Sequence, residues 1–136
     1  MNLQRLVHLA VEQSTELLRK HPGPLAPLAL LADSAGGPHW QQFEHNPDDP
    51  DRGIKAAEKW IQSAPIDVEA FALAYHGSIM LDATLRDAIV VHAAERGQAE
   101  GGQYVQAFEP ESEAGPLKML GIPLFQGDIP QLLEKD

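Results

Sequence analysis

Apolar residues recur at the spacing of one helical face over residues 2–20, and polar residues occupy the other positions of this stretch. Arg19, Lys20 and His21 fall in the expected last turn, where cations complement the helix dipole, and Pro22-Gly23-Pro24 follows them. The pattern predicts an amphipathic helix that ends near residue 20. Its buried stripe consists of Leu3, Leu6, Val7, Ala10, Val11, Ser14, Leu17 and Leu18.

The next segment has the pattern of a β-hairpin. Pro24–Ala35 is a short apolar run interrupted by a proline, which favours an edge strand or the start of a strand. Gly36-Gly37 is suited to a tight turn, and His39–His45 follows it as a possible returning strand. We therefore expect two antiparallel strands here.

A second helix is predicted from about Pro50 to Ser63. The preceding acidic segment can cap free backbone N–H groups through Asp49 or Asp51, and its carboxylates complement the positive end of the helix dipole. Ala64-Pro65 ends the helix.

The stretch Val68–Leu81 alternates between large and small side chains, as a strand with two different faces does. Small residues on one face would let a helix lie close to the sheet. The large face needs cover from a second layer or from another subunit. The large residues are Phe71, Leu73, Tyr75, Ile79 and Leu81, and the other face has Ala70, Ala72, Ala74, His76 and Ser78.

Three further strands are expected after this one. Arg86–Arg96 has a nearly continuous apolar centre, which indicates burial on both faces. Gln103–Glu109 is the next strand, and a short edge strand is plausible at Lys118–Phe125, where Pro123 limits pairing. The end of the chain, Ile129–Leu133, forms one helical turn or packs as a tail.

These elements predict one α+β domain over residues 1–136. The sheet is mixed or antiparallel, has about five to six strands and is accompanied by two main helices. The predicted order is α-β-β-α-β-β-β, with a further β element at the end.

Charge and composition exclude several classes of function. Twenty acidic and ten basic residues give a net charge of −10, which opposes binding to nucleic acid or anionic lipid. The chain has no cysteine, so disulfides and thiolate chemistry are excluded. No apolar run is long enough to span a membrane. The N-terminal residues also show no apolar h-region of the kind that a secretory signal contains. We therefore expect a cytoplasmic protein that binds neither nucleic acid nor membrane.

His76 and His92 are the most informative of the six histidines, because both belong to the central hairpin. A three-residue loop after Asp82 would place the two imidazoles opposite each other on one face, as a proton-sensitive or ligand-binding spot. A four-residue loop from Asp82 to Leu85 would place them on opposite faces. Two separately hydrogen-bonded histidines are the simpler interpretation.

No motif in the chain specifies catalysis, a metal or a phosphate group. The histidines lack the spacings that place two imidazoles on one face, and glycine-rich phosphate loops and the GxSxG elbow are absent. We therefore assign no catalytic residue, metal ligand or cofactor. The residues with the best prospect of binding are Leu73, Tyr75, His76, Arg86 and His92.

Two segments carry a resemblance to known proteins. PLAPLALLAD at Pro24–Asp33 and DAIVV at Asp87–Val91 resemble the first and central strands of small bacterial α+β families of uncharacterised function. The order of elements is similar to that of roadblock and profilin-like scaffolds, which commonly serve as interaction and dimerisation platforms. The resemblance covers most of the chain and implies architecture rather than activity.

These observations favour a non-enzymatic protein-interaction module that forms a homodimer and binds through a sheet face or an edge strand. A single layer holding both helices would leave the large face of Val68–Leu81 open for this purpose. An alternative is a small-molecule-binding protein or enzyme with a cleft near His76, His92 and Arg86. A further alternative is a secretion chaperone or immunity-type protein.

Overall fold

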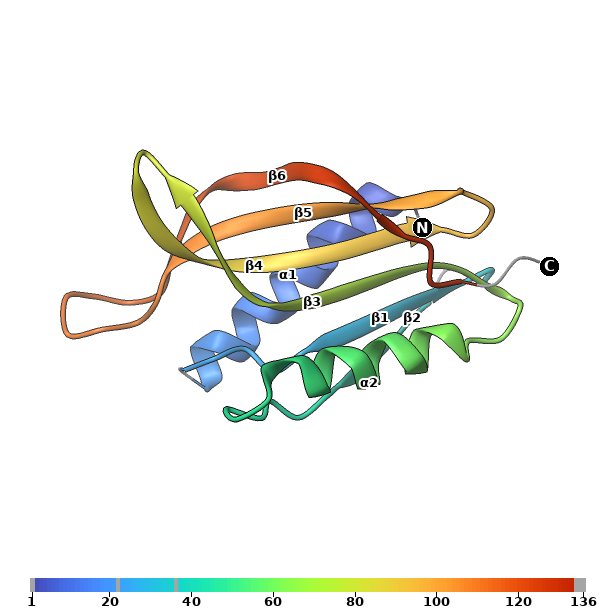
Figure 1. Ribbon diagram of the computed structural model, residues 1–136, viewed down its shortest axis with the longest axis horizontal. Coiled ribbons are helices and arrows are strands. Elements are labelled where there is room, and N and C mark those ends of the chain that lie inside the picture. The colour runs from blue at the N-terminus through green and yellow to red at the C-terminus, as the bar shows by residue number, and fades with distance from the viewer. Residues whose placement is uncertain (1, 22, 36, 134–136) are drawn as a thin grey trace.

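The chain folds around a six-stranded sheet, which the computed structural model describes over residues 2–21, 23–35 and 37–133 (Figure 1). The strands lie in the order β2-β1-β3-β4-β5-β6, and all neighbouring pairs are antiparallel. The predicted α+β class and order of elements are confirmed. The elements are α1 (Leu3–Lys20), β1 (Leu28–Asp33), β2 (Pro38–Gln42), α2 (Pro50–Gln62), β3 (Val68–Leu81), β4 (Thr84–Glu95), β5 (Glu100–Glu109) and β6 (Lys118–Pro130).

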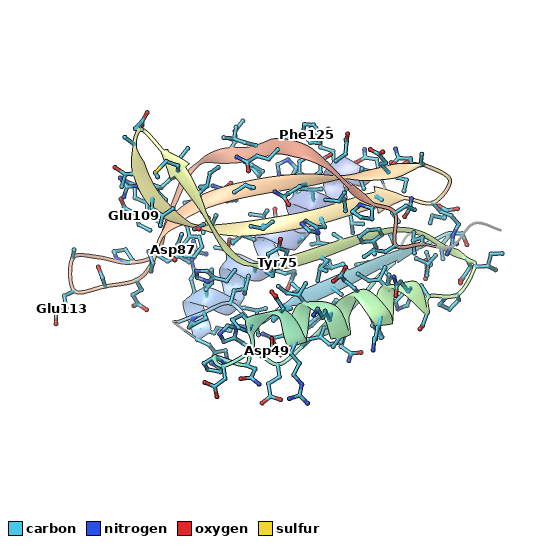
Figure 2. All side chains as sticks on the ribbon, in the orientation of Figure 1. Asp49, Tyr75, Asp87, Glu109, Glu113 and Phe125 are labelled. Atoms are coloured by element: carbon cyan, nitrogen blue, oxygen red, sulfur yellow. The ribbon has the colours of Figure 1, made fainter. Side chains whose placement is uncertain are left out.

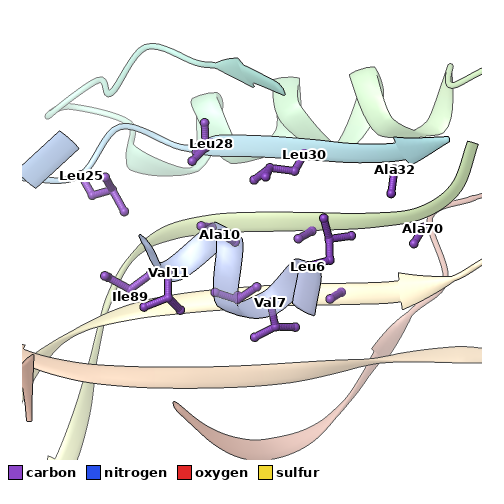
Figure 3. Close-up of a cluster of buried hydrophobic side chains, with 14 of the residues drawn as sticks. Leu6, Val7, Ala10, Val11, Leu25, Leu28, Leu30, Ala32, Ala70 and Ile89 are labelled. Carbon is purple, nitrogen blue, oxygen red and sulfur yellow. The ribbon is translucent and has the colours of Figure 1, made fainter. Parts of the chain in front are cut away.

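Helix α1 covers the face of the sheet that carries the small side chains of β3. It begins where the Asn2 side chain accepts a hydrogen bond from the Arg5 N–H at 2.8 Å, and it ends at Lys20, close to the predicted end. Figure 3 shows its apolar stripe packed against side chains of β1, β3 and β4. Pro22 and Gly36, to which the sequence assigned the helix stop and the β1–β2 turn, lie outside the described residues.

Helix α2 packs on the opposite face of the sheet (Figure 1). Its Ala57 and Ile61 are buried with Phe71 and Leu73 of β3, and both of these β3 side chains are fully inaccessible to solvent. The expectation that one layer holds both helices is therefore wrong, and this part of the large face is not open. Asp49 is the N-cap residue, although its side chain makes no hydrogen bond to the first turn.

A two-residue turn joins β3 to β4. Leu81 pairs with Thr84, so Asp82 and Ala83 form the turn. Their φ angles are 50° and 63°, and positive values at both positions define a type I′ hairpin turn. The predicted loops of three or four residues are therefore wrong. Asp82 and Ala83 form a two-residue turn of a type that usually has the sequence Asn-Gly.

The distal half of this hairpin bends away from the plane of the remaining sheet (Figure 1). Here Tyr75 and Ile79 contact a small cluster formed by Ala88, Val90 and Val105. Side chains of β4 and β5 thus partly cover the large residues of β3 that lie beyond α2.

Strand β6 is longer than predicted and ends at Pro130 instead of residue 125. A bulge at residues 121–123 interrupts its pairing with β5, opposite the single residue Gln106. The buried Gln106 amide donates to the carbonyl oxygens of Leu120 and Gly121, each at 3.3 Å, and so links β5 to the start of the bulge.

The residues around the end of β6 pack as a tail against the α2 side of the sheet. Ile129, Leu132 and Leu133 are buried in the same cluster as Phe71 and Leu73. Of the two arrangements predicted for this segment, the packed tail is confirmed. Neither helix in the described part of the chain is long and apolar enough to cross a membrane.

Candidate functional site

The register of the β3–β4 hairpin separates the two central histidines. His76 pairs with Ile89 and His92 pairs with Leu73, so the imidazoles lie on opposite faces of the sheet. The facing arrangement considered from the sequence is therefore wrong. Leu73, predicted to bind a partner, instead lies buried beneath α2.

Tyr75 and His92 do meet, together with a third residue that the sequence analysis missed. The Tyr75 hydroxyl lies 3.1 Å from His92 Nε2, and the Gln103 Oε1 atom lies 2.9 Å from the same nitrogen. The rings of Tyr75 and His92 are 5.2 Å apart and nearly perpendicular. Gln103 is directly opposite His92 across β4 and β5, and correct pairing of these strands would have identified it.

Burial keeps this trio neutral at neutral pH. Desolvation lowers the pKa of His92, although the Gln103 hydrogen bond and the charge of Glu58 oppose the change. Desolvation, followed by the charges of Glu58 and Asp51, raises the pKa of Tyr75. A neutral His92 with its proton on Nε2 donates to the Gln103 oxygen, which leaves Nδ1 unprotonated.

The trio contains no paired carboxylates and no serine, cysteine or lysine nucleophile. A phenol, a neutral imidazole and an amide can orient one another, but none of them is activated toward covalent chemistry. The described residues also contain no group of three or more histidine, aspartate or glutamate side chains that could hold a metal ion. The three side chains form a half-buried polar contact beside the apolar residues of this face.

His76 ties the loop after α1 to the sheet. Its Nδ1 accepts the Leu25 N–H at 3.1 Å, and its Nε2 donates to the Asp87 carboxylate at 2.9 Å. Its ring also packs edge-on against Phe108, with 5.4 Å between centroids. Both nitrogens are thus engaged within the chain.

The sequence suggested a cleft near Arg86, His76 and His92, but Arg86 pairs with Ile79 and His76 with Ile89, so these two side chains project from opposite faces of the sheet. Arg86 forms an ion pair at 3.2 Å with Glu109, the last residue of the neighbouring strand β5. His92 lies six positions further along β4, roughly 20 Å away at the rise of a strand. The three residues therefore do not line a common cleft.

The densest group of exposed apolar side chains lies on the edge strand β6. Ile122, Leu124 and Phe125 are 73%, 45% and 60% exposed. Figure 2 shows Phe125 at this outer edge, and its ring contacts Tyr104 with 5.6 Å between centroids. No charged residue occurs from Met119 to Gly127. We call the surface formed by residues 119–127 the β6 edge.

Comparison with known proteins gives no relative for this chain. No family model, curated protein or solved structure matches it. The resemblance to small bacterial α+β families and to roadblock and profilin-like scaffolds stays a prediction.

The free energy of unfolding should fall as the pH drops below about 6.5, in part because of His92. Its pKa is lowered in the folded state, so the unfolded chain binds the proton more readily. The contribution of neutral His92 to stability is fully present above the pKa that His92 has in the unfolded chain. It is lost as the pH falls from there toward the lower pKa of the folded state. Urea denaturation between neutral and mildly acidic pH should show a smaller pH slope for His92→Gln.

The matched control is His8→Gln, since His8 is exposed on α1. This variant should keep the slope of the parent protein over the same pH range. An unchanged slope in His92→Gln would contradict the assignment of this pH dependence to His92.

Proposed function

We propose that this protein is a non-enzymatic interaction module that binds a second copy of itself through the β6 edge. The observation that carries the proposal is the exposure of Ile122, Leu124 and Phe125 within four residues of an edge strand. An apolar surface of this kind favours association, because contact removes it from water.

The charge distribution favours a second copy as the occupant. Each chain carries a net charge of −10, so two copies repel one another over most of their surfaces. The β6 edge is free of charge over nine consecutive residues, 119–127. A symmetric contact would bring two such edges together, where the apolar gain is largest and the repulsion is smallest.

Side chains provide the main contact in this proposed dimer. Pro123 has no N–H group, and the bulge at residues 121–123 interrupts the strand, so a long backbone ladder between two β6 strands is disfavoured. Leu124, opposite Val105, and Phe125, opposite Tyr104, project to different faces of the sheet, so the proposed contact is edge to edge and includes side chains from both faces. The proposal places the protein in the cytoplasm, since a chain without cysteine needs no oxidising compartment.

The test is the mass of the untagged protein in solution, by native mass spectrometry and sedimentation equilibrium. We expect a dimer that dissociates on dilution from high to low micromolar concentration. The double variant Ile122→Ser, Phe125→Ser should be monomeric over this range while remaining folded, because both side chains project from the surface.

The matched control is Met80→Ser, Leu85→Ser, which removes two similarly exposed apolar side chains from the tip of the β3–β4 hairpin. This variant should remain dimeric. A monomeric parent protein at high micromolar concentration would refute the proposal, as would a β6-edge variant that dimerises as well as the parent.

A further inference from the structure

A hollow opens at the edge of the sheet opposite β6, between the C-terminal end of α2 and the β1–β2 hairpin. Its volume is about 460 Å³, within the usual range for small-ligand sites. Because β2 and β6 are at opposite ends of the strand order, this hollow is separate from the proposed dimer contact. Its lining includes Leu31 and Asp33 of β1, His39 of β2, Trp60 of α2, and Pro65 and Asp67 after this helix.

Trp60 provides the aromatic wall of this hollow. The side chain is half-buried, and Phe43 holds it through an edge contact with 6.0 Å between centroids. Leu31 is buried beneath it in the sheet, and Ala64 and Pro65 add apolar surface. An indole face is the best aromatic partner for an organic cation.

Two carboxylates, Asp33 and Asp67, line the hollow, together with His39, whose imidazole contacts Asp33 and offsets its charge when protonated. Asp33 accepts the N–H groups of Ala35 and Gly37 at 3.0 and 3.3 Å and contacts His39 Nε2 at 2.6 Å. The hydrogen bond with His39, followed by those from the Gly37 and Ala35 N–H groups, lowers the pKa of Asp33, so its carboxylate stays ionised at neutral pH. Asp67 lies on the exposed rim and is the more accessible counter-ion for a guest.

The end of α2 adds to this field. The helix terminates at Gln62, directly before the lining residues Ser63 and Ala64, and the C-terminal end of a helix dipole favours positive charge. Two cations nearby oppose this effect: Lys59 in the last turn of α2, and Arg96, which donates to the Pro65 carbonyl oxygen at 3.2 Å. Neither of them lines the hollow.

We propose that this hollow binds an organic cation, an alkylammonium or guanidinium group, with the Trp60 indole against its face and Asp67 as counter-ion. A cation would be attracted both by the indole of Trp60 and by the carboxylates, whereas an anion would be repelled by the two carboxylates. The cation is either a free small molecule or the lysine or arginine side chain of a peptide, and the two sources present the same chemistry to the site.

Trp60 can report binding directly. The chain has two tryptophans, and Trp40 is exposed on the opposite face of the sheet, so Trp40→Phe leaves Trp60 as the single reporter. Titration of this variant with argininamide or n-butylammonium should change Trp60 emission in a saturable way. Neutral 1-butanol should have no saturable effect. Absence of saturation with both cations would overturn the proposal.

Charge variants test the role of Asp67. Asp67→Asn in the Trp40→Phe background should weaken argininamide binding by about five-fold, as expected for one partly exposed counter-ion. The control is Asp128→Asn, which removes an exposed carboxylate from β6 and should leave affinity unchanged. Equal weakening by both variants would indicate general electrostatic attraction and would overturn the assigned site.

A short acetylated peptide with one arginine distinguishes the two sources of the cation. Tighter binding of this peptide than of argininamide would support a peptide partner, and equal or weaker binding would support a free cation. A peptide with glutamine in place of the arginine should not bind. These measurements use emission and not oligomeric state, so failure of the dimer proposal and failure of this one are distinguishable.

Discussion

Replacing Leu73 with alanine should lower the free energy of unfolding by about 2–5 kcal/mol. The side chain is fully buried between the sheet and α2, at the centre of β3. Its removal costs the transfer free energy of the lost methyl groups and leaves a cavity, since strands on both sides of β3 restrict relaxation. Urea denaturation of the two proteins measures the difference.

The control for this prediction is Leu124→Ala on the β6 edge. Leu124 is the same residue type, but it is 45% exposed, so its truncation should change the stability of the monomer by only about 0.5 kcal/mol. It should instead weaken the proposed dimer. If Leu73→Ala were as stable as the parent protein, the packing of α2 against this face would be wrong.

The order of elements could be predicted because the local patterns are strong. The spacing from Leu3 to Leu18 matches one helical face, and α1 buries that face. The alternation of large and small side chains in Val68–Leu81 also matches the structure, in which a different helix covers each face of the strand. Helix α1 packs on the alanines, and α2 packs on Phe71 and Leu73.

The placement of α2 was not predictable from the same patterns. Strand β1 is apolar on both faces, so Ala29 and Leu31 meet α2 while Leu28 and Leu30 meet α1. A strand without polar alternation does not indicate which helix covers which face. Tertiary packing decides the question.

The candidate site depended on a turn that the local sequence does not mark. Type I′ turns favour Asn-Gly, and here Asp82 and Ala83 adopt positive φ values instead. A change of one residue in the length of this loop decides whether His76 and His92 lie on the same face of the sheet or on opposite faces. The contact between Tyr75 and His92, and the presence of Gln103 beside them, follow only when this register is known.

The two proposed binding surfaces place different demands on the same acidic chain. The β6 edge is charge-free and suits a second copy, which carries the same net charge. The hollow beside Trp60 is lined by Asp33 and Asp67 and suits a guest of opposite charge. Because the two surfaces are at opposite edges of the sheet, the two proposed contacts do not compete for the same residues.

Alanine at Gly101 should lower the free energy of unfolding by about 1–3 kcal/mol. A Cβ at this position would lie 2.6 Å from the Ala93 carbonyl oxygen, 2.8 Å from Ala94 Cβ and 3.0 Å from Ile129 Cγ1. The first of these atoms belongs to the backbone of β4 and cannot rotate away. The loss of glycine's flexibility in the unfolded chain returns only about 0.5–1 kcal/mol, so the steric cost is larger.

The same substitution should loosen the tail, since Ile129 is the contact that can move. Methyl NMR should therefore show larger changes at Leu132 and Leu133 than in the cluster around α1, and urea denaturation should show the lost stability. Gly37→Ala is the control, because a Cβ there meets no atom within 4 Å. If Gly101→Ala proved as stable as this control, the close packing of β4, β5 and the tail would be incorrect.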